Sequence, residues 1–63
     1  MSFEIGEKIT WSVGNTTCRG LVREIFDDTL DVICYEINNK PTRSKITLHL
    51  ENLTIYKDEY TQN

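Results

Sequence analysis

Histidine, cysteine and proline are scarce in this chain of 63 residues, which has one histidine, two cysteines and one proline. Cys18 and Cys34 are too few for a disulfide framework, and their spacing is not that of a zinc site. A bridge between them would need an oxidising compartment, so we expect free, buried thiols. His49 has no serine or cysteine near it in sequence that could act as a nucleophile. We therefore expect no metal, no cofactor and no enzymatic activity.

Long hydrophobic runs are also missing from the chain. No apolar stretch approaches the roughly 20 residues that a membrane-spanning helix requires. The opening "MSFEIGEK" has neither the cationic segment nor the apolar segment of a secretory signal. We therefore expect a cytoplasmic protein without membrane contact.

The composition is that of one small folded domain, with 38% hydrophobic and 27% charged residues. The formal net charge is −3. Autonomous nucleic-acid binders usually carry a basic face, so the total charge argues against that role. Because a phosphate group responds to the charge close to it, the net charge alone does not rule out nucleic-acid binding.

Hydrophobic residues recur with a period of two, which predicts strands. In "KITWSV", Ile9, Trp11 and Val13 share one face of an extended chain. Glycine, asparagine and aspartate clusters between such runs indicate turns. Gly20 lies inside the second run and indicates a bulge or a sharp bend. The pattern predicts strands at residues 8–13, 18–26, 30–37, 45–50 and 54–56, a connection at 38–44, and a single helical turn at 51–53.

Five short strands with turn signals about every ten residues are typical of a small antiparallel barrel or sandwich. Closing the sheet would remove its exposed edges, so we expect an all-β, five-stranded antiparallel barrel. The helical turn should precede the last strand. We expect one domain over residues 1–56 and a polar tail over residues 57–63.

The opening stretch resembles the small SH3-like barrels of the KOW and Tudor type. The resemblance covers residues 3–56 and rests on the pattern "G-D-x-V-x-W … G … G-x-V-x-x-I", with Glu7 in place of the usual aspartate. The ending "ITLHLENLTIY" is similar to the last two strands of those barrels. The matching residues are Gly6, Glu7, Ile9, Trp11, Gly14, Gly20, Val22 and Ile25.

The resemblance implies binding rather than catalysis, with nucleic acids, ribosomal or transcription proteins, or methylated side chains as partners. A methyl-lysine cage needs about three or four converging aromatic rings. The loop at residues 14–17, where such barrels commonly place one of them, has none. We therefore expect Trp11 to fill the core.

The predicted third strand is apolar on both faces, and only one face is needed for the core. Ile33, Tyr35 and Ile37 would form the second apolar face, which we predict to be a protein interface. The first hypothesis is a non-enzymatic protein-binding module that forms a homo-oligomer, with a dimer as the simplest case, and occupies a surface on a larger partner. A viral or mobile-element accessory or inhibitor protein would suit this size and composition.

Basic residues gather on the second strand and after the third, which supports a second hypothesis. A KOW/Tudor-like nucleic-acid adaptor would use them to bind phosphate, and the same residues would suit an acidic protein surface. A weaker third hypothesis is an oligomer that sequesters a small anionic ligand such as a nucleotide. The basic residues are Arg19, Arg23, Lys40, Arg43 and Lys45.

Overall fold

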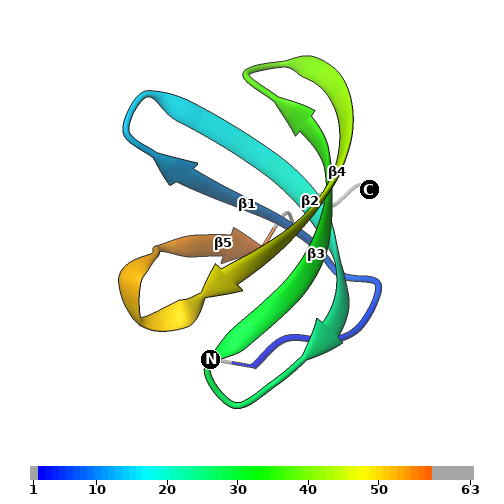
Figure 1. Ribbon diagram of the computed structural model, residues 1–63, viewed down its shortest axis with the longest axis vertical. Helices are drawn as coiled ribbons and strands as arrows, with labels where there is room; N and C mark the ends of the chain where they lie inside the picture. The colour runs from blue at the N-terminus through cyan, green and yellow to red at the C-terminus, as the bar shows by residue number, and fades with distance from the viewer. Residues whose placement is uncertain (1, 58–63) are drawn as a thin grey trace.

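The computed structural model describes residues 2–57, which form one antiparallel sheet of five strands (Figure 1). The strands lie in the order β4-β3-β2-β1-β5, so consecutive strands are neighbours except for β5, which returns to pair with β1. The elements are β1 Lys8–Val13, β2 Thr16–Ile25, β3 Thr29–Ile37, β4 Lys40–His49, the 3-10 helix η1 Leu50–Asn52, and β5 Ile55–Lys57.

The all-β prediction, the strand number and the helical turn before the last strand are confirmed for the described residues. The predicted closed barrel is wrong. Within residues 2–57, β4 pairs with β3 and β5 pairs with β1, and these two outer strands do not pair with each other. β5 has only three residues, and η1 separates it from β4. Lys57 belongs to β5 and not to the predicted tail, and the other residues of that tail, 58–63, lie outside the described part of the chain.

The predicted connection at residues 38–44 is also wrong, because a two-residue turn joins β3 to β4. Asn38 and Asn39 have φ angles of 50° and 69°, the left-handed backbone that tight hairpin turns require and that asparagine tolerates. The Oδ1 atom of Asn38 accepts a hydrogen bond of 2.9 Å from the backbone N–H of Thr17. Pro41 lies inside β4, where an outer strand can accommodate its missing N–H.

This earlier start of β4 changes the placement of three basic residues. Lys40, Arg43 and Lys45 were expected in or beside a loop, and they instead lie along an outer strand. Charged side chains on such a strand border an edge of unpaired backbone groups.

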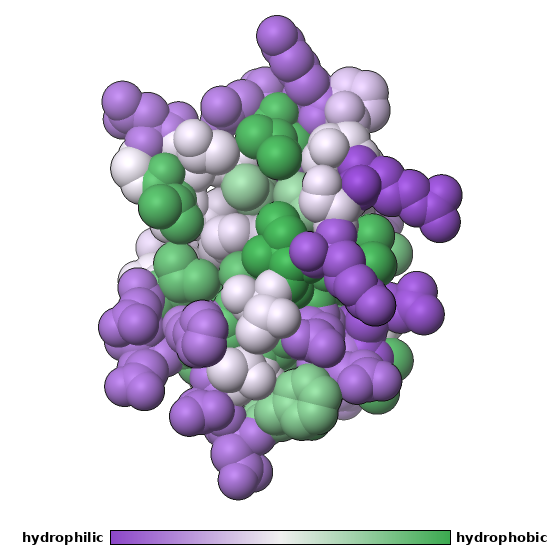
Figure 2. Space-filling model, viewed as in Figure 1, coloured by the Kyte–Doolittle hydropathy of each residue, from purple (hydrophilic) through white to green (hydrophobic). Residues whose placement is uncertain are grey.

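The core covers one face of the curled sheet. Trp11 is 2% exposed, which confirms its expected core position. In the view of Figure 2, hydrophobic residues lie at the centre of the surface and also reach its sides, interspersed with hydrophilic residues. The buried residues are Ile9, Trp11, Cys18, Val22, Leu30, Val32, Cys34, Leu48 and Ile55, with Phe3, Ile37, Ile46, Leu50 and Leu53 packed against them.

Gly20 allows the tryptophan ring to lie directly against β2. A Cβ atom at this position would be 2.7 Å from the carbonyl oxygen of Ile33 and 3.0 Å from Cη2 of Trp11. The strand register shifts between Arg19 and Gly20, so a bulge does lie beside Gly20, but its extra residue belongs to β3 and not to the strand in which the sequence indicated it.

That bulge also decides which way the end of β3 faces. Cys34 pairs with Gly20, but Glu36 pairs with Arg19 and Ile37 with Cys18, so Tyr35 is the extra residue. An extra residue reverses the alternation of the side chains that follow it. Ile37 consequently packs against the core.

Candidate functional site: the outer face of the sheet

The outer face, defined here as the sheet surface opposite the core, carries two adjacent aliphatic side chains at its centre. Leu21 of β2 pairs with Ile33 of β3, and both are half-buried. Because side chains alternate along a strand, their neighbours Val22 and Val32 point to the core. An exposed lysine flanks the pair at each end of this row, which reads Lys8, Leu21, Ile33 and Lys45 across four strands.

A hollow of about 220 Å³ lies beside Ile33. A register shift between Val22 and Glu24 marks a second bulge in β2. This bulge allows two consecutive residues, Arg23 and Glu24, to line the same hollow. The lining residues are Arg23, Glu24, Asp31, Ile33 and Lys45.

Both signs of charge surround the hollow without neutralising each other. Arg23, Glu24 and Lys45 form no ion pair with any of the residues that the structure describes. Asp31 is held in place, since its Oδ1 atom accepts a hydrogen bond of 2.9 Å from Oγ1 of Thr47 on β4. Unpaired charges of both signs beside an aliphatic side chain are available to an incoming surface.

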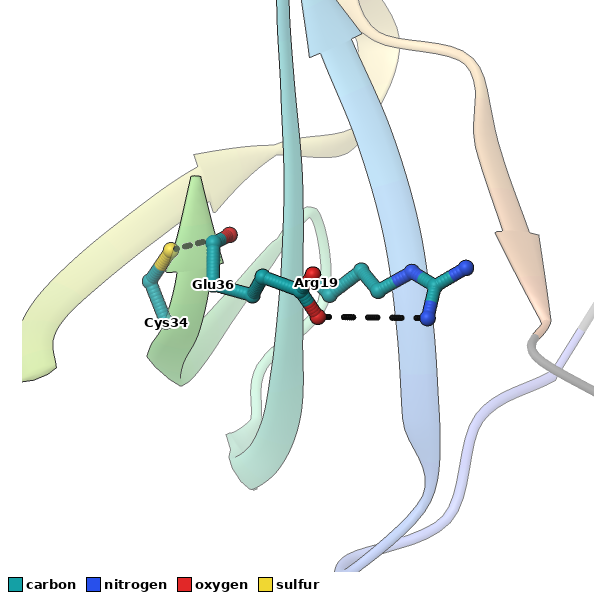
Figure 3. A network of polar contacts seen from close by, with 3 residues as sticks. All are labelled: Arg19, Cys34 and Glu36. Carbon is teal, nitrogen blue, oxygen red and sulfur yellow. Dashed lines mark hydrogen bonds and ion pairs between the residues drawn. The ribbon is translucent and has the colours of Figure 1, made fainter. Parts of the chain in front are cut away.

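Arg19 and Glu36 form an ion pair on the same face, next to the β3 bulge. In Figure 3 a dashed line joins the Arg19 guanidinium to the Glu36 carboxylate on β3, with Nη1 and Oε1 3.9 Å apart. Their side chains are 39% and 26% exposed, so the pair contributes at most about 1 kcal/mol. The Sγ atom of Cys34 turns to the backbone of Glu36 and donates to its carbonyl oxygen at 3.5 Å.

The structure brings together only part of the predicted apolar interface. Ile33 lies at the centre of the outer face and Tyr35 is half-buried at the bulge. Ile37 lies on the core side, so its assignment to the interface is wrong. Leu21 takes its place beside Ile33, although the sequence analysis did not select it.

The predicted basic residues fall into two groups. Arg19, Arg23 and Lys45 lie on the outer face. Arg43 is two residues from Lys45 on β4 and shares its face, whereas Lys40 pairs with Ile37 on the core side. Lys8 was not selected from the sequence, because its membership of the row depends on cross-strand pairing.

Leu21 had a signal in the sequence. From Arg19 to Arg23 the chain alternates charged, apolar and charged residues at every second position, which places Leu21 on the face of the two arginines. The acidic members Glu24 and Asp31 had none, since a bulge and a pairing register position them.

A second hollow, of about 180 Å³, is lined by the apolar residues Phe3, Leu50, Leu53 and Ile55. Beside it, the Nζ atom of Lys57 lies 5.5 Å from the centroid of the Phe3 ring and 3.2 Å from Oε2 of Glu7. These contacts hold the segment of residues 3–7 against β5. We therefore treat this hollow as a gap at the edge of the hydrophobic core and not as a binding site.

The described residues offer little for metal chemistry or reactive thiols. Nowhere in residues 2–57 do three or more His, Cys, Asp or Glu residues gather in a way that could hold a metal ion. Cys18 and Cys34 are free and buried. Burial raises the pKa of the Cys18 thiol above its ordinary value, and the neighbouring Cys34 raises it further. A thiol with a raised pKa is a poor nucleophile at neutral pH.

No helix in residues 2–57 has the length and apolar character needed to cross a membrane. Comparisons with protein families, curated proteins and solved structures found no match to this chain.

Proposed function

We propose that this protein is a non-enzymatic protein-binding module whose contact surface is the outer face of its sheet. A second copy of the chain is its first partner, and a larger protein is the target of the assembly. The observation that carries the proposal is the pair Leu21 and Ile33, two half-buried aliphatic side chains that lie side by side on the face opposite the core.

The surroundings of this pair support a protein partner. Protein interfaces combine an apolar centre with a polar rim. Here the rim contains cations and carboxylates, with Arg23 and Lys45 beside Glu24 and Asp31. A twofold dimer presents the same surface from both subunits, so a surface carrying both signs can place opposite charges across the interface.

The finer fold assignment is part of the same proposal. We infer an SH3-like module of the KOW and Tudor type that remains open between β4 and β5. The five antiparallel strands and the 3-10 helix before β5 support it. So does Gly20, which stands at the third glycine of the resemblance and makes room for Trp11.

Light scattering over a range of protein concentrations tests the dimer. Ile33→Glu places a carboxylate in the proposed interface and should yield a folded monomer. Val32→Glu is the matched control, because the adjacent residue on the same strand is 0% exposed in the core. That variant should unfold the domain, since burying an unpaired charge is strongly destabilising. A wild-type protein that stays monomeric at high micromolar concentration would refute the dimer.

A second candidate function has one specific observation in its favour. Arg19, Arg23 and Lys45 share the outer face with Lys8, which could track a nucleic-acid backbone. A salt titration separates the two candidates. Binding to single-stranded nucleic acid should weaken steeply between about 50 and 200 mM salt, whereas an apolar dimer interface should change little. Thermal shifts on adding nucleotides would instead favour sequestration of a small anionic ligand.

A further inference from the structure

β4 has a long free edge. It is a strand of ten residues, and among the described residues it pairs with β3 alone. Its other edge therefore presents unpaired backbone donors and acceptors, as any outer strand does. β5 forms the opposite edge of the sheet and has three residues. A partner strand would find most of its backbone hydrogen bonds at β4.

The charge of β4 is of one sign. Its sequence, KPTRSKITLH, contains three of the chain's seven basic residues and none of its ten acidic residues. Lys40, Arg43 and Lys45 are all exposed. None of the three forms an ion pair with another residue in the described part of the chain. In a protein with a net charge of −3, this edge is a local concentration of unpaired positive charge.

We propose that the free edge of β4 binds an extended acidic segment of the partner protein, which adds to the sheet as a sixth strand. The inference rests on the proposed function, because it names the chemistry of the partner that the module binds. In this mode of recognition the backbone ladder supplies affinity and alternate side chains supply specificity. Acidic side chains at every second position would lie along Arg43 and Lys45, which share one face of β4, whereas Lys40 pairs with Ile37 and lies on the other face.

Charge disfavours a second copy as the occupant of this edge. A second copy that paired through its own β4 would add three more cations and no carboxylate to the same edge. Like charges on facing strands are destabilising. Lysine and proline also protect sheet edges from indiscriminate pairing. Basic residues on the edge repel other basic strands but attract an acidic one.

A capped ten-residue peptide of alternating glutamate and valine is the probe. Titrated into isotopically labelled protein, it should shift the backbone amide resonances of residues 40–49 and leave those of residues 55–57 in place. A peptide with lysine in place of glutamate should not bind. A third peptide keeps every glutamate but has proline at its two central valines, which removes N–H donors and disfavours pairing. It should bind at least tenfold more weakly than the probe.

Charge variants of the protein give an independent measurement. Arg43→Glu and Lys45→Glu should each weaken peptide binding about threefold to tenfold, since each replaces one exposed attraction by a repulsion. Val13→Glu is the control, because Val13 is 61% exposed on an inner strand and alternates with the outer-face residues of β1. It should change binding less than twofold at about 150 mM salt, where exposed charges are screened beyond about 8 Å. Thermal melts establish that each variant is folded.

Three results would overturn the proposal: no binding at millimolar peptide, equal binding of the proline peptide, or amide shifts centred on β5. The Ile33→Glu variant separates this proposal from the proposed dimer. If that variant binds the peptide as wild type does, the edge acts independently of the outer face. If the wild-type protein dimerises but ignores the peptide, the dimer stands and the edge proposal fails.

Discussion

Replacing Gly20 with alanine should destabilise the protein more than the same substitution at Gly6 or Gly14. The new Cβ would lie 2.7 Å from the backbone oxygen of Ile33, and 3.0 and 3.1 Å from Cη2 and Cζ3 of Trp11. The oxygen is a backbone atom of β3, which pairs with β2, and the ring is 2% exposed, so neither group can move aside cheaply. The added methyl must therefore push β3 or the indole ring out of place.

The expected magnitude follows from the crowding. Overpacking a well-packed core costs about 1–3 kcal/mol, and two crowded partners place Gly20→Ala toward the upper half, at about 2–3 kcal/mol. In a domain of this size, 1 kcal/mol shifts the melting temperature by roughly 4–8 °C. We expect the Gly20→Ala variant to melt about 10–20 °C below wild type.

Thermal and urea unfolding followed by circular dichroism measure the loss directly. Trp11 is the single tryptophan of the chain, so its fluorescence reports the displaced ring without labelling. Gly14→Ala is the comparison variant. Its Cβ would have no atom within 4 Å, and at a φ of +61° the cost is backbone strain of about 1 kcal/mol. A Gly20→Ala protein at least as stable as the Gly14→Ala protein would refute the packing argument.

Two further predictions concern the core thiols and the β3–β4 turn. Because the pKa of Cys18 is raised in the folded protein, the unfolded chain releases this proton first, and the free energy of unfolding should fall as pH rises above about 8.5. Urea titrations from pH 7 to 10 should show a shallower fall for Cys18→Ala, and identical slopes would contradict the assignment. Asn39→Val puts a β-branched residue at a φ of 69° and should cost about 1–3 kcal/mol, whereas Asn39→Gly should melt within a few degrees of wild type; equal melting of the two variants would argue against the turn geometry.

The interface and edge experiments are informative because they test different parts of one sheet. Ile33 is central to the outer face and Lys45 lies in the same row on β4. A variant at Ile33 should alter self-association, a variant at Arg43 should alter peptide binding, and a variant at Lys45, which also belongs to the rim of the outer face, should alter both.

The candidate site shows where sequence reasoning reached its limit. Ile33 was selected correctly for the outer face, because the alternation of β3 holds without interruption from Leu30 to Cys34. Ile37 was assigned to that face by extending the same alternation, and the bulge at Tyr35 turns it to the core. Leu21 became part of the site through its pairing with Ile33, which is a property of two strands together.

The β3–β4 connection is a different case. Asn38 and Asn39 are adjacent and both accept positive φ, so the local sequence did contain a two-residue turn. Pro41 favoured a longer loop because proline interrupts inner strands. Its presence in β4 became understandable only from the position of β4 at the edge of the sheet.

Local sequence by itself determined that this chain forms strands, where most of the turns fall, and that Trp11 belongs to the core. Those properties depend on the alternation of side chains and on the backbone freedom of glycine and asparagine, which act over a few residues. Tertiary structure alone decided the open seam between β4 and β5, the two bulges in the β2–β3 pairing, and the charges that meet around Ile33. These features depend on register between strands, and a shift of one residue reverses every side chain beyond it.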